Sequence, residues 1–207
     1  IDARDGHIYK SVKIGSQTWM AENLAYLPQV DSDSSSTASR YYVYAYTPSS
    51  YTESEQIRAA KETTNYKTYG VLYNWPAAMA GTVSSSDDPS GVQGACPSGW
   101  HLPSTAEWDT LHAYVDLKNG NDGDGYSLKA KTGWNSSGNG SDQFGFSALP
   151  AGDRLNKGNF SYLGYTAIFW SATEFGSGRA YYRYLGYNGA NMYTDYDGEG
   201  NALSIRC

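Results

Sequence analysis

Two cysteines are the first residues in this sequence whose chemistry constrains the protein. Cys96 stands before a turn rich in proline and glycine, and Cys207 is the last residue. With two cysteines in 207 residues, the simplest interpretation is a disulfide that holds the final strand beside the helix expected after Cys96. A disulfide indicates an oxidising compartment, because the cytosol keeps thiols reduced. The alternative is a pair of free thiols, one in the core and one at the end of the chain.

The histidines and carboxylates do not form a recognised catalytic or metal-binding motif. The histidines lack the close spacing of a zinc site, and His101, beside a proline-rich turn, is more typical of a hydrogen-bonded structural residue. A glycosidase needs two carboxylates across a cleft, and the acids considered for that role are Glu22, Glu107, Asp153 and Glu174. Because a helix cap explains Glu107 and nothing pairs the others, we expect no catalytic residue, no metal and no cofactor.

An acidic, glycine-rich segment over residues 119–125 is the strongest candidate for binding calcium. Asn119, Asn121, Asp122 and Asp124 supply hard oxygen atoms of the kind that calcium prefers. The glycine and glutamate that an EF-hand loop requires are missing in any register. Acidic, glycine-rich segments are common without a metal, so we expect a solvated loop here.

Tyrosines are concentrated in the segment 179–196, near the end of the chain. A strand alternates its side chains, so Tyr182 and Tyr184 share one face while Tyr181 and Arg183 take the other. Exposed tyrosine offers a large contact area at little cost in rotamer entropy, which is why Tyr, Ser, Gly and Asn dominate antibody paratopes. The residues that we expect to contact a ligand are Tyr181, Tyr182, Arg183, Tyr184, Tyr187, Asn188, Asn191, Tyr193, Asp195 and Tyr196.

Composition excludes several classes of partner. The formal net charge of −6 argues against binding to nucleic acid or to an anionic membrane surface, since both require a basic face. The sequence has no run of apolar residues long enough to span a membrane, and it opens without a basic leader segment, so we expect any signal peptide to have been removed. Only 17% of residues are charged while glycine and tyrosine are abundant, which favours a secreted, loop-rich fold containing β-strands.

Two capping boxes mark the expected starts of helices. Ser104 and Glu107 form a capping box, and Trp108, Leu111 and Val115 then recur on one face, which predicts a helix packed against a core. A second capping box, with threonine at position 52 and glutamate at position 55, predicts a short polar helix that runs to about Thr63.

Strands are expected on both sides of the main helix. Residues 5–20 read as two short strands joined at a glycine turn, followed by a brief helical turn over 20–24. The segment 69–79 is apolar enough to be buried. The remaining expected strands are 41–46, the central pair 144–150 and 167–173, and a hairpin or meander over 180–207 with turns near 186–189 and 197–200.

Several motifs resemble those of a known family, the Fibrobacter succinogenes major paralogous domain, whose members are secreted or surface proteins. They are Asp-Gly-x-x-Tyr (5–9), Val-Lys-Ile-Gly-x-Gln-x-Trp-Met-Ala-Glu-Asn-Leu (12–24), Tyr-Gly-x-Leu-Tyr-Asn-Trp (69–75), Cys-Pro-x-Gly-Trp-His-Leu-Pro (96–103), Phe-Gly-Phe-Ser-Ala-Leu-Pro-Ala-Gly-x-Arg (144–154), Phe-Trp-Ser-Ala-Thr-Glu (169–174) and Ser-Ile-Arg-Cys (204–207). Because they span nearly the whole chain, we expect one domain over residues 1–207.

The resemblance implies an α+β, C-type-lectin-like fold with twisted antiparallel sheets, two or three short helices and long loops. That fold is similar to the formylglycine-generating-enzyme fold, whose enzymes use cysteine chemistry. Here both cysteines lie where a lectin-like fold places a structural bridge, so the resemblance implies no such enzyme. The sugar-binding calcium motifs of C-type lectins are also missing. The family commonly has an aromatic-x-Arg-x-Leu pattern, so Tyr182, Arg183 and Leu185 are equally well explained as framework.

Some lectin-like proteins, including members of this family, are diversified by retroelements that mutate adenines near the end of the gene. The segment 179–196 is similar to such a variable region in position and composition. We therefore expect a non-enzymatic receptor-binding or adhesion module, located outside the cell, on its surface or on a virion. Its expected partner is a protein or glycan on a cell surface, with no nucleic acid and no membrane insertion. The alternative is a secreted polysaccharide-active enzyme or an accessory carbohydrate-binding domain.

Overall fold

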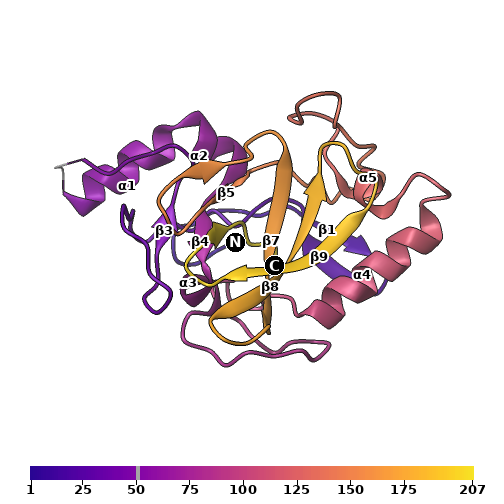
Figure 1. Cartoon of the computed structure of the whole chain (residues 1–207), viewed down its shortest axis with the longest axis horizontal. Coiled ribbons are helices and arrows are strands. Elements are labelled where there is room, and N and C mark those ends of the chain that lie inside the picture. The colour runs from indigo at the N-terminus through magenta and orange to yellow at the C-terminus, as the bar shows by residue number, and fades with distance from the viewer. Residues whose placement is uncertain (50–51) are drawn as a thin grey trace.

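In a computed structural model that describes residues 1–49 and 52–207, the strands form three antiparallel sheets. The first sheet pairs β1 (Ser11–Ile14) with β2 (Gln17–Met20). The second has the order β3 (Tyr41–Tyr42), β4 (Leu72–Asn74), β10 (Ala202–Leu203), β5 (Asp153–Arg154) and β6 (Phe160–Ser161). The third consists of β7 (Thr166–Glu174), β8 (Arg179–Gly186) and β9 (Met192–Gly198), which lie at the centre of Figure 1.

The helices lie at the two ends of this arrangement. Figure 1 shows α1 (Glu53–Glu62) and α2 (Thr64–Tyr69) on one side, and α4 (Thr105–Lys118) and α5 (Asp124–Leu128) on the other. The short α3 (Trp75–Met79) follows β4 directly, and its last three residues are buried. Both predicted capping boxes are confirmed, because Thr52 caps α1 and Ser104 caps α4. The fold is thus a mixed α+β structure with antiparallel sheets and short helices.

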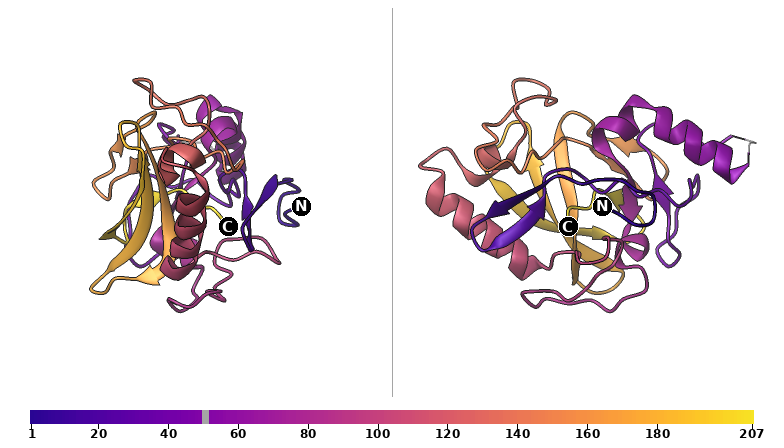
Figure 2. Two further views of the ribbon diagram at one scale, coloured as in Figure 1. Left: turned by 90° about the vertical axis from the view of Figure 1, so that its right-hand side faces the viewer. Right: turned by 180° about the vertical axis from the view of Figure 1, so that it is seen from behind.

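Helix α4 forms the middle layer on its side of the molecule. In the left view of Figure 2 it lies between the β7–β8–β9 sheet and the β1–β2 hairpin. Its predicted apolar face is buried, and the Trp108 ring lies 4.7 Å from Trp19 of β2 and 5.7 Å from Phe169 of β7. Aromatic pairs at these separations add stabilisation beyond the burial of area. The helix therefore fixes the sheet and the hairpin relative to each other.

Strand β7 is shared by the two largest clusters of buried side chains. Phe169 belongs to the core around α4, whereas Ile168 and Trp170 belong to the core that includes Tyr73 and α3. This division follows from the alternation of side chains along a strand. On the edge away from β8, Trp170 N–H donates to the Ser204 carbonyl at 3.1 Å. The strand predicted over 167–173 is confirmed, and it is buried on both faces.

The disulfide predicted between Cys96 and Cys207 is confirmed. The two residues are 111 positions apart in the sequence, and their Cα atoms are separated by 6.0 Å. The Met20 N–H donates to the Cys207 carbonyl at 2.8 Å, so the same residue also contacts β2. The final segment is therefore held to the turn that precedes α4 and to the first hairpin.

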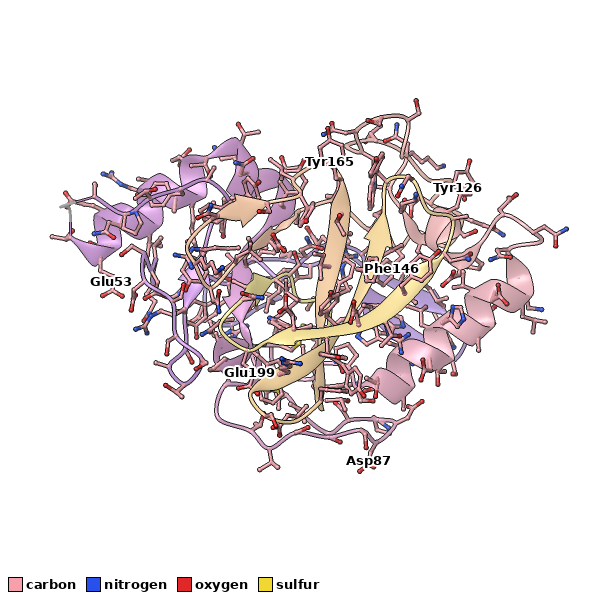
Figure 3. The ribbon with its side chains drawn as sticks, viewed as in Figure 1. Glu53, Asp87, Tyr126, Phe146, Tyr165 and Glu199 are labelled. Carbon is pink, nitrogen blue, oxygen red and sulfur yellow. A yellow bond between two sulfur atoms is a disulfide. The ribbon has the colours of Figure 1, made fainter. Side chains whose placement is uncertain are left out.

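Two predicted elements are wrong, because the backbone of both segments pairs with distant parts of the chain and with a buried arginine. Arg206 is fully buried, and its guanidinium donates to the carbonyls of Met20 and Phe146 and to Asn23 Oδ1. The segment 20–24 is not helical, since the Leu24 N–H donates to the Ile205 carbonyl. The segment 144–150 forms only an isolated bridge, between Ala148 and Lys129, because Ser147 has a left-handed backbone with φ of 53°. The core position of Phe146 is visible in Figure 3.

Strand boundaries account for the remaining corrections. The first hairpin begins at Ser11, and Ile8, which was assigned to a strand, is 69% exposed. The strand expected over 41–46 is limited to Tyr41 and Tyr42, because Ala45 has a left-handed backbone with φ of 58°. A left-handed residue turns the chain out of a sheet. Within the described residues, no helix is both long enough and apolar enough to cross a bilayer.

Candidate functional site

The β7–β8–β9 sheet carries most of the residues that were predicted to bind a ligand. Strand β8 lies between the other two, with Tyr182 directly opposite Asp195 and Tyr184 directly opposite Tyr193. Directly opposed residues of an antiparallel pair point to the same side of the sheet, while neighbours along a strand alternate. The predicted residues are therefore divided between two faces and the connecting turn.

One face presents a row of tyrosine rings. We call it the tyrosine–aspartate face, and it consists of Tyr182, Tyr184, Tyr193, Asp195 and Asp197. The Tyr182 and Tyr184 ring centroids are 6.0 Å apart, and those of Tyr184 and Tyr193 stack at 5.4 Å. Tyr182 also contacts the buried Trp170 ring edge-on at 6.3 Å. The row runs from the core to Tyr193, which is 44% exposed. Because each ring contacts the next, its orientation is fixed by its neighbour.

Carboxylates line the same face. Asp195 accepts the backbone N–H of Tyr196 at 2.8 Å, and Asp197 accepts that of Gly198 at 2.7 Å. Asp153 of β5 is buried, and its Oδ1 has no hydrogen-bond partner among the described residues. Burial, together with the negative charge of Asp197, raises the pKa of Asp153 to about 6. In the described parts of the chain, no lysine, arginine or histidine forms an ion pair with these three acids.

The opposite face of β8 turns towards α4, and Arg183 is not available there to a ligand. Arg183 is 5% exposed, and its Nη2 donates to Asp109 Oδ1 at 2.5 Å and to the Thr105 carbonyl at 3.1 Å. The assignment of Arg183 as a ligand contact is therefore corrected. Its side chain joins β8 to the first turns of α4, which is the framework role that was left open, and Leu185 is buried beside it.

A second aromatic cluster occupies the end of this helix-facing side. The rings of Phe175 and Tyr196 are parallel, with centroids 3.7 Å apart, and Tyr181 contacts Phe175 edge-on at 5.3 Å. The Arg179 guanidinium lies 5.6 Å from the Tyr196 ring centroid. Tyr181 and Tyr196 thus belong to a surface separate from the tyrosine–aspartate face, because they point to the other side of the same sheet.

The turn between β8 and β9 presents the last three predicted residues. Asn188 and Asn191 are exposed, and Tyr187 is partly buried. The turn is held from below by Lys129, whose Nζ donates to the carbonyls of Gly186 at 3.1 Å and Gly189 at 2.9 Å. Burial lowers the pKa of Lys129. A cation at these carbonyls fixes the hairpin tip without any metal.

The segment 119–125 is not a solvated loop throughout, which corrects the expectation. Asp124 is 1% exposed and begins α5. Its Oδ1 accepts the Met192 N–H at 3.0 Å, and its Oδ2 lies 2.7 Å from His112 Nδ1 on α4. The carboxylate therefore connects α4 and α5 to the first residue of β9. This hydrogen bond fixes the start of β9 relative to the two helices.

His101 has the hydrogen-bonded role that was predicted. Its Nε2 lies 2.5 Å from Glu107 Oε1, and Glu107 Oε2 accepts the backbone N–H groups of Ser90 and Ser104 at 3.0 Å each. Burial alone would raise the pKa of Glu107, but these hydrogen bonds lower it and raise the pKa of His101. The pair borders a cleft of about 410 Å³ that Trp100 also lines.

The other nominated acids stay apart. Glu22 accepts the Lys10 N–H at 2.6 Å, and Glu174 is exposed at the end of β7. Asp153 differs, because its neighbour Asp197 affects its ionisation. Over the residues that the structure describes, no three His, Cys, Asp or Glu side chains gather where they could hold a metal ion.

Sequence reasoning missed Asp197 and Phe175 and left Asp153 without a partner. Asp197 could have been found, because Tyr193, Asp195 and Asp197 alternate along one strand and so share a face. Phe175 and Asp153 carry no such signal. Their positions beside the hairpin depend on tertiary contacts between segments that are distant in the sequence.

The fold and this surface together define a class of protein: a mixed α+β domain, linked by one disulfide, that presents aromatic and acidic side chains on a three-stranded sheet. The family model of the Fibrobacter succinogenes major domain matches residues 12–207, and the chain belongs to that family. The match confirms the resemblance carried by the sequence motifs. No curated protein and no solved structure matches the chain significantly.

Proposed function

We propose that this domain is an extracellular, non-enzymatic binding module with a C-type-lectin-like fold. It contacts a protein or glycan on a cell surface through the β8–β9 hairpin. The observation that carries this proposal is the row of tyrosine rings, which begins at the buried Trp170 and ends at the exposed Tyr193. Rings held in place before binding lose little conformational entropy when a ligand arrives.

The test compares a hairpin variant with a matched tyrosine variant elsewhere. The domain is applied to a glycan array and to a panel of purified cell-surface proteins, and the affinity for each hit is then measured. We expect Tyr184→Ala with Tyr193→Ala to weaken binding by on the order of tenfold or more, because exposed aromatic side chains dominate interface energies. Tyr162→Ala is the control, since Tyr162 is 59% exposed outside the hairpin. Equal loss in the control, or full affinity in the double variant, would contradict the proposal.

Diversification by a retroelement is the second part of the proposal, and sequencing the end of the gene in related isolates tests it. We expect codon changes at exposed hairpin positions such as Tyr193 and Asp195. Leu185 and Met192 should stay unchanged, because both are buried against α4 and substitution there would disturb packing. Identical codons throughout 179–196, with no near-copy repeat nearby, would exclude diversification and leave the binding proposal intact.

An enzyme acting on polysaccharide is the second candidate, and the environment of Asp153 favours it. A carboxyl group with a pKa of about 6 beside another carboxylate resembles the acid and base of a glycosidase. Hydrolysis of a polysaccharide panel by the wild type, absent in Asp153→Asn, would establish this activity. A lack of hydrolysis by the wild type, combined with ligand binding, would support the binding module instead.

A further inference from the structure

The tyrosine–aspartate face has a charge as well as a shape. Asp195 and Asp197 point to the same side of β9 as Tyr193, and each uses one carboxylate oxygen to accept a neighbouring backbone N–H. The other oxygen of each group has no ion-pair partner in the described residues. The exposed ring of Tyr193 and two unneutralised carboxylates therefore lie side by side on one strand.

Three basic residues near this face are engaged elsewhere. Arg183 pairs with Asp109 on the opposite side of the sheet, and Lys129 donates to carbonyls beneath the turn. Arg154 is next to Asp153 in β5, but its guanidinium donates to Ser34 Oγ and the Ser32 carbonyl, both at 2.6 Å. Alternation along β5 sends Arg154 and Asp153 to opposite sides. The negative charge is thus left without an internal counter-ion.

Asp153 of β5 is coupled to this negative charge and to Tyr182. Asp153 is 6% exposed, and its Oδ1 accepts no hydrogen bond from the described residues, so that oxygen is buried without a partner. Burial, followed by the charges of Asp195 and Asp197, raises the pKa of Tyr182 well above its ordinary value. The charges of Asp195, Asp197 and Asp153 therefore all act on the ring row at Tyr182.

We propose that this face recognises a lysine or arginine side chain presented by a partner protein, an inference that rests on the proposed binding function. The face of an aromatic ring attracts a cation within about 6 Å of its centroid, and a carboxylate beside it adds an ion pair. A neutral sugar would cover Asp195 and Asp197 without neutralising them, which costs desolvation energy. An acidic partner would be repelled, in keeping with the net charge of −6.

The experiment uses short peptides as probes of the 207-residue chain. N-acetylated, C-amidated pentaglycine peptides carrying arginine, lysine or glutamine at the central position are titrated at low salt and followed by NMR. We expect the arginine and lysine peptides to shift the ring resonances of Tyr184 and Tyr193, and the glutamine peptide to leave them in place. Asp195→Asn with Asp197→Asn should weaken binding of the basic peptides on the order of tenfold, since two charge contacts are lost.

Matched controls separate a specific site from general charge attraction. Asp116→Asn removes an exposed acid on α4 and should leave the affinity within twofold of the wild type, a modest screening effect. Equal weakening by Asp116→Asn, or shifts that map away from the hairpin, would overturn the proposal. Binding of neutral oligosaccharides at Tyr184 and Tyr193 without any response to basic peptides would also overturn it, yet would leave the binding function of the hairpin standing. If no peptide, glycan or protein bound to the hairpin, the proposed binding function itself would be contradicted.

Discussion

Asp153 is a residue whose ionisation acts against folding. Asp153 is buried on β5, its ionisation is coupled to Asp197, Tyr182 and Tyr44, and no ion pair within the described residues compensates its charge. The pKa is raised from 3.8 to about 6, so the folded protein binds this proton more tightly than the unfolded chain does. The stabilisation from the neutral form is therefore complete below pH 3.8 and is lost as the pH rises through 6.

We predict that Asp153→Asn becomes more stable relative to the wild type as the pH rises from 4.5 to 7.5. Asparagine cannot ionise, so the variant avoids a cost that reaches about 3 kcal/mol in the wild type above the raised pKa. Urea unfolding at several pH values measures the difference in free energy. Asp116→Asn is the control, since that carboxylate is exposed on α4. A difference between Asp153→Asn and the wild type that stays constant with pH would show that Asp153 ionises normally.

At the scale of secondary structure, the elements that sequence reasoning found are those with local signals. Helix α4 carries its own start signal in Ser104 and Glu107, and its apolar period is complete within one segment. Strand β7 is a continuous apolar run bounded by polar residues, a pattern that indicates a buried strand. Both were predictable because no distant residue was needed to specify them.

The elements that failed depend on residues far away in the sequence. The segments 20–24 and 144–150 form neither the predicted helix nor the predicted strand, and Arg206, more than 50 positions from either, donates hydrogen bonds to carbonyls in both. Buried backbone groups must be paired, and a side chain can take the place of a helix or a sheet ladder. Nothing in the apolar pattern of either segment reveals that the pairing comes from an arginine.

The candidate site shows the same division between local and distant information. Tyrosine content and alternation located the hairpin and separated its two faces. They did not show that Arg183 turns towards Asp109 on α4, nor that the ionisation of Asp153 on β5 is coupled to Asp197. The alternation of side chains along a strand indicates which of them share a side of the sheet. Which side is covered depends on how other elements, here α4, pack against it.

At the scale of the whole molecule, two cores share β7, and the segment after β9 joins them. Ile205 packs in the core with α3, and Arg206 reaches Phe146 in the core with α4. Cys207 then closes this segment onto Cys96. Because the last five residues touch both cores, the disulfide constrains the whole fold, and its contribution should be seen in global unfolding.

We predict that Cys96→Ser with Cys207→Ser lowers the free energy of unfolding by about 2–5 kcal/mol, since the bridge restricts the unfolded chain across a long loop. The bridge spans 111 residues, which places the loss towards the upper end of that range. Guanidinium unfolding followed by tryptophan fluorescence measures the change. Dithiothreitol should lower the free energy of unfolding of the wild type by a similar amount. It should leave that of the double variant unchanged, because the variant has no bridge to reduce. An unchanged unfolding midpoint in the double variant would mean that burial of Ile205 and Arg206 alone holds the end of the chain against both cores.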